Sequence, residues 1–226
     1  LNFVHNRAGL AGESRFETAV EVSKEAYPTI AVSGAQTAAG AVVLVGENAI
    51  VDGLAAAPLA AQEDAPILLT KKDTVPTETM KEIKRLVQKG SDIYLIGGEN
   101  TISKEVEAEL VKEMNANIIS LSGDDRYATS LAIAEEITTP NSRAFVVGGE
   151  GLADAMSIAA VAAKGGAEET DANPILLVPT TGLTKDQTKF VTNLTTKAYV
   201  VGGETSVSAD VEIELEKMPN VSIKRI

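Results

Sequence analysis

The groups of this chain that could carry chemistry recur in pairs, one in each half of the sequence. Gly97-Gly98-Glu99 and Gly202-Gly203-Glu204 each lie between an apolar run and a helical pattern. Backbone N–H groups at such a turn can bind an anion at the start of the helix. The same glycines also suit a tight turn that needs a positive φ. No GxGxxG or P-loop pattern accompanies them, so a nucleotide site is not expected.

Asp52 and Asp154 form a second pair, because each follows an apolar run and precedes a helical pattern. They are candidates for catalytic carboxylates at strand ends or for helix N-caps, the interpretation that we favour. His5 is the only histidine, cysteine is absent, and no Asp-x-Asp occurs. A multi-histidine metal centre and a Ser-His-Asp triad are therefore not expected. We predict no catalytic residues, no metal site and no cofactor.

The basic candidates are Arg15 and Arg126, each at the expected start of a helix beside acidic residues. They could grip a carboxylate or phosphate on a polymer, or pair with the neighbouring acids, and both interpretations stay open. Lys71 and Lys72 follow an apolar strand. The lysines and arginine between residues 81 and 89 suit either a solvated helix face, which is the commoner case, or a local basic patch.

Composition narrows the choice of partner. The chain has 226 residues and a net charge of -12, which argues against nucleic acid, because a phosphate backbone attracts clustered Lys and Arg. No apolar run is long enough to span a membrane, and the first residues do not resemble a signal peptide. The absence of cysteine excludes disulfides and leaves the compartment open.

The elements that must position these groups alternate along the chain. Continuous apolar runs predict strands buried on both faces, as in a parallel sheet; they lie at residues 42–46, 66–69, 93–98, 145–149, 174–178 and 199–203. Helical patterns between them predict an α/β fold with mostly parallel sheets flanked by helices. Ser103 and Ser208 are expected N-caps, and Thr184 with Gln187 fits a capping box. Pro58 should bend or shorten the alanine-rich helix around it.

Three sequence blocks recur in the same order with a period of about 105 residues, longer than a solenoid repeat. This period predicts two small domains in tandem. We expect repeat unit 1 at residues 1–117, unit 2 at 118–220, and the start of a third unit at 221–226. Loops are expected around residues 28–40 and 165–173. Duplication favours a repeated binding surface over a single asymmetric catalytic site.

Taken together, these blocks resemble the type 2 cell-wall-binding repeat of Gram-positive surface proteins. The resemblance covers nearly the whole chain and rests on the motifs at residues 65–69, 94–103, 123–129 and 146–155. Clostridial S-layer proteins are the best-known carriers, and residues 51–60 are especially similar to their high-molecular-weight, cell-wall-anchoring subunits.

The resemblance implies Toprim-like units, three to a protein, arranged about a pseudo-threefold axis and binding an anionic secondary cell-wall polymer without catalysis. The motif most tied to anchoring falls on Ile67, Leu68 and Leu69 and on Ile175, Leu176 and Leu177; as apolar residues, they would shape the site rather than touch sugar. This chain departs from the family pattern in lacking a third repeat, in carrying Ser14 and Phe16 in place of an acid and a tyrosine, and in lacking a proline equivalent to Pro58 in the second copy.

We therefore predict a secreted, non-enzymatic module of the cell wall or S-layer surface. It would bind an anionic polysaccharide or teichoic-acid-like polymer through Arg15, Arg126, Lys71, Lys72 and the two apolar motifs. S-layer subunits, including a low-molecular-weight partner, are the expected protein partners, without nucleic acid or membrane insertion. The alternatives are a component of a wall-directed hydrolase and a purely structural lattice protein.

Overall fold

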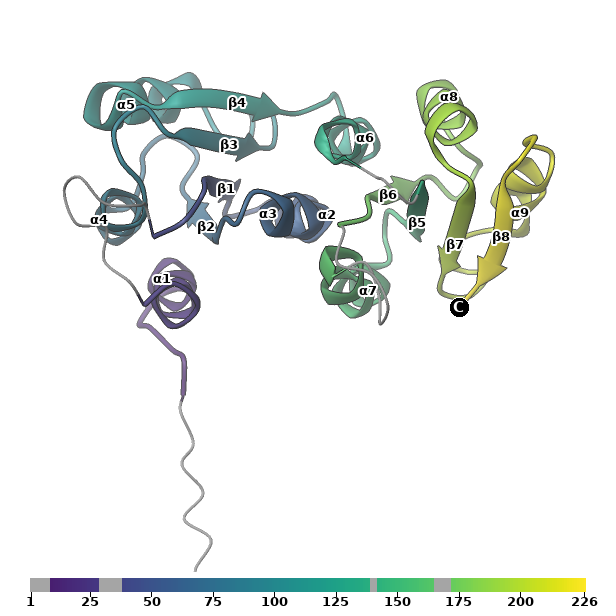
Figure 1. The fold of residues 1–226 in the computed structure, drawn as a ribbon, viewed down its shortest axis with the longest axis horizontal. Coiled ribbons are helices and arrows are strands. Elements are labelled where there is room, and N and C mark those ends of the chain that lie inside the picture. The colour runs from purple at the N-terminus through teal and green to yellow at the C-terminus, as the bar shows by residue number, and fades with distance from the viewer. Residues whose placement is uncertain (1–8, 29–37, 139–141, 165–171) are drawn as a thin grey trace, which may run out of the picture.

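The computed structural model describes residues 9–28, 38–138, 142–164 and 172–226. Two parallel four-stranded sheets lie side by side with helices around them (Figure 1). His5 and most of the two expected loops, at residues 29–37 and 165–171, lie outside the described residues.

The first sheet has the strand order β2-β1-β3-β4, with every neighbouring pair parallel. Its strands are β1 (Val42–Gly46), β2 (Ile67–Thr70), β3 (Asp92–Ile96) and β4 (Asn117–Leu121). The helices of this half are α1 (Arg15–Ala26), α2 (Ile50–Ala55), α3 (Ala57–Gln62), α4 (Thr77–Leu86) and α5 (Lys104–Met114). β1 is buried at all five positions, as continuous apolarity predicts for a central strand.

The second sheet repeats this topology as β6-β5-β7-β8. Its strands are β5 (Arg143–Gly148), β6 (Ile175–Val178), β7 (Lys197–Val201) and β8 (Ser222–Arg225), and its helices are α6 (Arg126–Glu136), α7 (Leu152–Lys164), α8 (Lys185–Leu194) and α9 (Ala209–Glu216). The α/β class with parallel sheets is thus confirmed. Toprim-like units and the pseudo-threefold axis stay predictions.

The sheets divide the chain at a different place from the expected repeat boundaries. β4 completes the first sheet by pairing with β3, and β8 completes the second by pairing with β7. Residues 222–225, which we assigned to the start of a third unit, therefore serve as the last strand of the second sheet. Below, "first unit" and "second unit" mean the two sheets with their helices; the limits of the sequence repeats stay a prediction.

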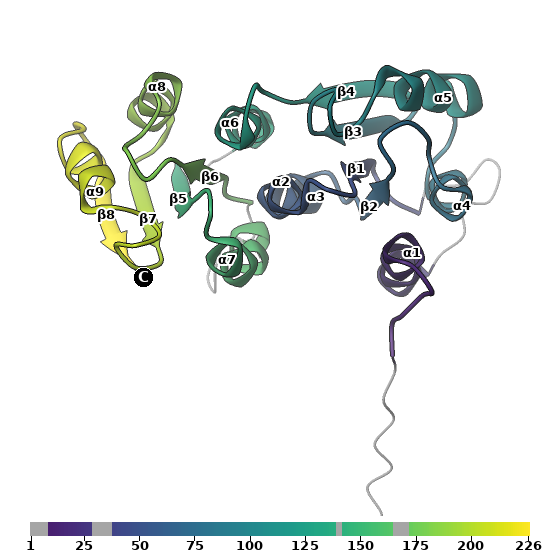
Figure 2. The ribbon, with the colours of Figure 1, turned by 180° about the vertical axis from the view of Figure 1, so that it is seen from behind.

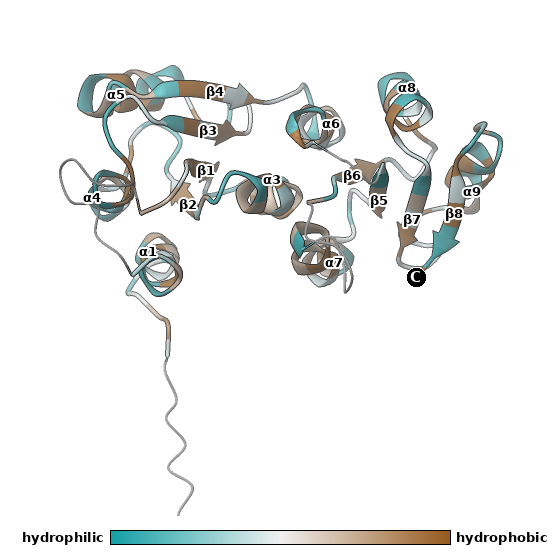
Figure 3. Ribbon diagram, in the orientation of Figure 1, coloured by the Kyte–Doolittle hydropathy of each residue, from teal (hydrophilic) through white to brown (hydrophobic). Residues whose placement is uncertain are grey.

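The two units meet through a shared apolar core. One cluster of buried side chains includes Val45 and Leu59 from the first unit and Val147 and Ile158 from the second. In it, α2 and α3 pack against α6 and α7, an arrangement visible from both sides in Figures 1 and 2. Figure 3 shows that α7 is apolar along much of its length. A separate apolar cluster fills the outer part of each unit.

Local sequence determines several helix ends. The helix expected around Pro58 is split at Ala56 into α2 and α3, whereas α7, with Ala160 at the matching position, is continuous. The capping box of Thr184 and Gln187 is formed. Ser103 and Ser208 occupy N-cap positions, but neither makes a side-chain cap hydrogen bond.

The favoured N-cap interpretation of Asp52 and Asp154 is wrong. Ala49 occupies the N-cap of α2, and each aspartate lies in the first turn of its helix. The helices begin earlier than expected because the turns after β1 and β5 close through backbone bonds, from Ala49 N–H to the Gly46 carbonyl and from Gly151 N–H to the Gly148 carbonyl.

Candidate functional site

A pocket of about 620 Å³ lies where the first unit passes into the second. It sits beyond the carboxyl ends of β3 and β4, beside the start of α6. Such ends of parallel strands are the usual ligand-binding edge of an α/β sheet. The lining is mostly polar and consists of Asp52, Gly98, Glu99, Asn100, Thr101, Ser122, Gly123, Asp124, Asp125, Arg126 and Thr129. We call it the junction pocket.

The glycine turn at the junction pocket has the positive φ that its sequence indicated. Gly97 has a φ of 118° and its counterpart Gly202 a φ of 99°, in the region that favours glycine. The carbonyl of Gly98 accepts hydrogen bonds from the N–H groups of Thr101 and Ile102. The tight-turn interpretation is therefore confirmed, and the turn places Gly98, Asn100 and Thr101 along one wall of the pocket.

Arg126 opens α6, where Asp125 accepts a hydrogen bond from the N–H of Ala128 and fixes the helix start. The Nη1 of Arg126 donates to the Gly149 carbonyl at 2.6 Å and pairs with Glu150 Oε1 at 3.0 Å. The structural role that we considered for this arginine therefore exists. These contacts leave part of the guanidinium accessible, because the Arg126 side chain is 39% exposed and lines the junction pocket.

Asp52 reaches the same pocket from the other unit. Burial raises the pKa of the Asp52 carboxyl above its ordinary value, and the nearby Arg126 guanidinium partly opposes this rise. The second-unit counterpart, Asp154, instead accepts a hydrogen bond from Ser206 Oγ at 2.7 Å. The junction pocket therefore brings the Asp52 carboxyl group of the first unit near the Arg126 guanidinium of the second.

Arg15 repeats the local role of Arg126 but lies outside the junction pocket. Its Nη1 donates to the Glu47 carbonyl at 2.9 Å, at the turn equivalent to Gly149. Lys71 Nζ lies 5.9 Å from the centre of the Phe16 ring, so Lys71 stands beside the start of α1. Lys71 and Lys72 are both exposed. The predicted basic residues therefore form two groups, Arg15 with the lysines and Arg126 alone.

The two apolar motifs form edge strands that support helices. Leu68, Leu176 and Leu177 are fully buried, and none of the six motif residues lines the junction pocket. On the unpaired edge of β6, side chains bind the backbone groups of Leu177. Its N–H donates to Ser130 Oγ, and its carbonyl accepts a hydrogen bond from Gln187 Nε2 at 2.6 Å. In β2, Thr79 Oγ1 donates to the Leu69 carbonyl. Because α1 packs on β2 and α6 on β6, these strands position the helices that carry Arg15 and Arg126.

Of the four basic residues at 81–89, Lys84 and Arg85 form ion pairs within the chain, and Lys89 lies beyond the helix on which we expected it, because α4 ends at Leu86. Lys84 pairs with Glu113 at 2.7 Å, and Arg85 pairs with Glu82 at 2.6 Å. These contacts favour the structural interpretation for those two side chains.

Asn100 belongs to the glycine turn that the sequence indicated, and we considered Asp124 only as an ion-pair partner of the arginines. Sequence reasoning missed two further polar residues that line the junction pocket, Thr101 and Ser122. They follow the glycine turn or precede Arg126, so proximity to two recurring motifs was an available signal. Within the described residues, no group of three or more His, Cys, Asp or Glu side chains could hold a metal ion. In the same part of the chain, no helix has the length and apolarity needed to cross a membrane.

Relatives agree with this architecture. The solved structures of Cwp8 and Cwp6 from Clostridium difficile each superpose with a TM-score of 0.82 over 96% of this chain, at 42% and 31% identity. The chain is 30% identical over 214 residues to the N-acetylmuramoyl-L-alanine amidase LytC of Bacillus subtilis and 33% identical over 211 residues to the amidase enhancer of the same organism. These matches cover 94% and 93% of this chain.

The chain corresponds to only part of each relative. It spans 35% of Cwp8, 32% of Cwp6, 39% of LytC and 26% of the amidase enhancer. The shared region is thus a module found in proteins with different names. Residues 10–107 and 120–212 match the family described as cell wall binding domain 2 (CWB2), so this chain belongs to the CWB2 family of cell-wall-binding domains.

Proposed function

We propose that this chain anchors a surface protein noncovalently to an anionic secondary cell-wall polymer, with the junction pocket as a contact site. The observation that carries the proposal is the open, polar pocket formed by both units, in which Arg126 keeps an exposed guanidinium. A guanidinium binds carboxylate or phosphate oxygens with two parallel hydrogen bonds. The surrounding Asn, Thr and Ser side chains suit the hydroxyl groups of a glycan.

The acidic surroundings define how an anionic polymer would bind. Glu99, Asp124 and Asp125 also line the pocket, and they repel anionic groups except close to Arg126. We therefore propose that one anionic group of the polymer meets Arg126, while sugar hydroxyls donate to the carboxylates. Arg15, Lys71 and Lys72 would form a second contact at the end of β2. Two weak contacts on one polymer combine through effective concentration.

Sedimentation with purified wall polymer, compared with peptidoglycan stripped of polymer, tests the anchoring. We expect retention on the polymer only, and equal retention on both would overturn the proposal. Arg126→Gln should weaken retention about tenfold, because it removes a charge-assisted contact. Lys217→Gln is the matched control, since Lys217 is an exposed basic residue at the end of α9, and it should change retention less than twofold.

We also propose that a third unit, in the same protein or in another chain, covers the exposed face of α7. Met156 and Val161 on that helix are 61% and 43% exposed. The equivalent face of α2 and α3 is covered by α6 and α7. Comparing polymer retention and thermal stability with and without a third repeat tests this proposal. Unchanged values for both would contradict it.

An enzymatic role is the competing proposal, because one relative is named as an amidase. That relative extends well beyond the region shared with this chain, so we propose that the shared region supplies wall binding and that hydrolysis belongs to the rest. Release of new amino groups from peptidoglycan by this chain alone would contradict the proposal. We propose in addition that the protein is secreted, which surface labelling tests, and that it assembles with S-layer subunits, which co-purification tests.

A further inference from the structure

The inference begins at Arg225, whose guanidinium fills a polar niche in the second unit. It lies on β8 and is held by three acceptors from the turn and helix beyond β7. Its Nη1 donates to the Gly202 carbonyl at 2.7 Å, its Nη2 to the Val207 carbonyl at 3.1 Å, and its Nη2 and Nε to the Glu212 carboxylate at 2.8 and 3.2 Å.

The first unit contains the same niche without the arginine. In the strand register, Arg225 pairs with Val200, and Ser120 pairs with the equivalent Leu95. Equal numbers of positions separate Glu107 from Ser120 and Glu212 from Arg225. The three acceptors thus recur as Glu107 and the carbonyls of Gly97 and Ile102, but the side chain opposite them is a serine.

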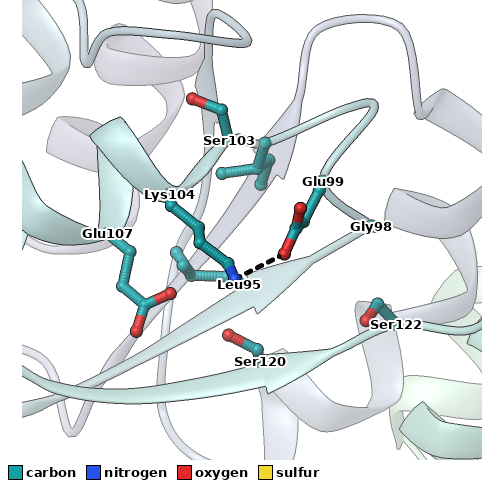
Figure 4. Close-up of a pocket in the computed structure, with 10 residues that line it drawn as sticks. Leu95, Gly98, Glu99, Ser103, Lys104, Glu107, Ser120 and Ser122 are labelled. Carbon is teal, nitrogen blue, oxygen red and sulfur yellow. Dashed lines mark ion pairs between the residues drawn. The ribbon is translucent and has the colours of Figure 1, made fainter.

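Replacing arginine by serine leaves a pocket of about 240 Å³. Figure 4 shows Glu107, Ser120 and the Lys104–Glu99 ion pair around it. Leu95, Gly97, Ile102 and Ser122 also line it. No described side chain donates a hydrogen bond to Glu107 or to the Gly97 and Ile102 carbonyls, so the acceptors that Arg225 satisfies in the second unit have no such donor in the first.

The charge of this pocket favours a cation. Glu99 and Glu107 outnumber Lys104 among its charged groups. Lys104 does not replace the arginine, because its Nζ pairs with Glu99 at 3.0 Å and its side chain is 76% exposed. The N-terminus of α5 opposes a cation through the helix dipole. In the second unit, the N-terminus of α9 opposes a cation in the same way, and the Arg225 guanidinium is nevertheless bound there.

We propose that the pocket between β3, β4 and the start of α5 binds an alkylguanidinium group, carried by a small molecule or by an arginine side chain of another protein. A planar guanidinium would reproduce the arrangement of Arg225, with two N–H groups on the Glu107 carboxylate and others on the two carbonyls. The ligand is opposite in charge to the wall polymer, so this site is independent of the function proposed above.

Titration with agmatine, followed by amide chemical shifts, tests the proposal on the intact chain. We expect saturable binding in the millimolar range with shifts centred on Gly97, Ile102 and Ser120. A Gly-Arg-Gly peptide distinguishes an arginine side chain from a free guanidine, and binding of either supports the site. n-Butylamine tests the head group. Equal affinity for n-butylamine, or no saturable binding of any guanidinium compound, would overturn the proposal.

Variants locate the site. Ser120→Arg should fill the pocket from within and abolish agmatine binding, while Glu107→Gln should weaken it about tenfold. Glu105→Gln is the matched control, because this acid lies on the same helix but does not line the pocket; it should change affinity less than twofold. Arg225→Ser should create a second agmatine site with shifts at Gly202. Agmatine binding that survives both Ser120→Arg and Glu107→Gln would contradict the assignment.

Discussion

The two units have the same strand order, yet equivalent helices meet different surroundings. Leu59 on α3 is fully buried against the second unit, whereas Val161, at the matching position of α7, is 43% exposed. The backbone topology is therefore repeated, but burial is set by what each unit packs against. A duplicated sequence does not give duplicated environments.

The contact between α1 and α4 in the first unit also differs in chemistry from the equivalent contact between α6 and α8 in the second. In the first unit, Ser23 Oγ on α1 donates to the buried Glu82 on α4, and Arg85 binds Glu82 with two hydrogen bonds and the Tyr27 carbonyl with a third. In the second unit, the matching positions are the buried apolar Ala134 and Phe190. One fold thus accepts either a saturated polar network or an apolar contact at the same place.

The largest expected effect is the difference in stability between truncating the buried Leu59 and truncating the exposed Val161. Leu59→Ala should lower the free energy of unfolding by about 3 kcal/mol, because it leaves a cavity in the shared core. Val161→Ala should lower it by less than about 0.5 kcal/mol. Urea denaturation of both variants checks the contrast. A loss at Val161 as large as that at Leu59 would mean that this face of α7 is covered in solution.

The polar network should give the next largest effect. Glu82→Gln should cost about 2 kcal/mol at neutral pH, because it leaves the half-buried Arg85 without its carboxylate. Burial by itself raises the pKa of Glu82, but hydrogen bonds from Arg85 and Ser23 outweigh it and hold the pKa below its usual value.

This lowered pKa fixes the pH dependence of the Glu82 contribution. The stabilisation is present above the unfolded value of 4.5 and is lost as the pH falls through the folded value. The difference between wild type and Glu82→Gln should therefore shrink below about pH 4.5. Denaturation across this range measures it, and a constant difference would argue against an ionic contribution.

The broken helix provides a smaller test. Pro58→Ala should cost about 0.5–1 kcal/mol, since proline restricts the unfolded chain at a position that it already suits. Hydrogen exchange at residues 55–58 shows whether α2 and α3 then join, as the continuous α7 suggests. If protection there stays as in the wild type, the break is imposed by tertiary packing instead of by the proline.

The smallest effect is expected at the junction pocket. Burial raises the folded pKa of Asp52 above its unfolded value of 3.8, so its ionisation weakens folding as the pH rises through the folded pKa. Asp52→Asn should therefore stabilise the protein slightly at neutral pH and have no such effect below about pH 3.8. Thermal melts check this.

Arg126→Gln provides a second measurement on the same pair. Without the opposing guanidinium, the pKa of Asp52 should rise further, which a carboxyl NMR titration would show. An unchanged pKa would mean that Arg126 does not act on Asp52.

Much of the fold could be predicted from local patterns. The apolar runs that became β1, β3 and β5 are continuous because both faces of these central strands are covered. The helix break near Pro58 could be predicted because the missing N–H and the fixed φ of proline are local properties. The capping box at Thr184 has the same origin, because its partners are neighbours in the chain.

The candidate site required the tertiary structure. Asp52 and Arg126 are far apart in sequence, and only the packing of α2 and α3 against α6 brings them to one pocket. The sequence shows that Ser120 and Arg225 differ at equivalent positions. Only the structure shows that Arg225 binds two carbonyls and the Glu212 carboxylate, and therefore what Ser120 lacks.

The sequence by itself determined the duplicated α/β architecture and its helix breaks, because these follow from hydrophobic periodicity and backbone stereochemistry within a few residues. The tertiary structure alone decided which copy of each repeated residue is buried, paired or exposed. That difference arises because burial and charge pairing depend on groups from distant parts of the chain, which the two copies do not share.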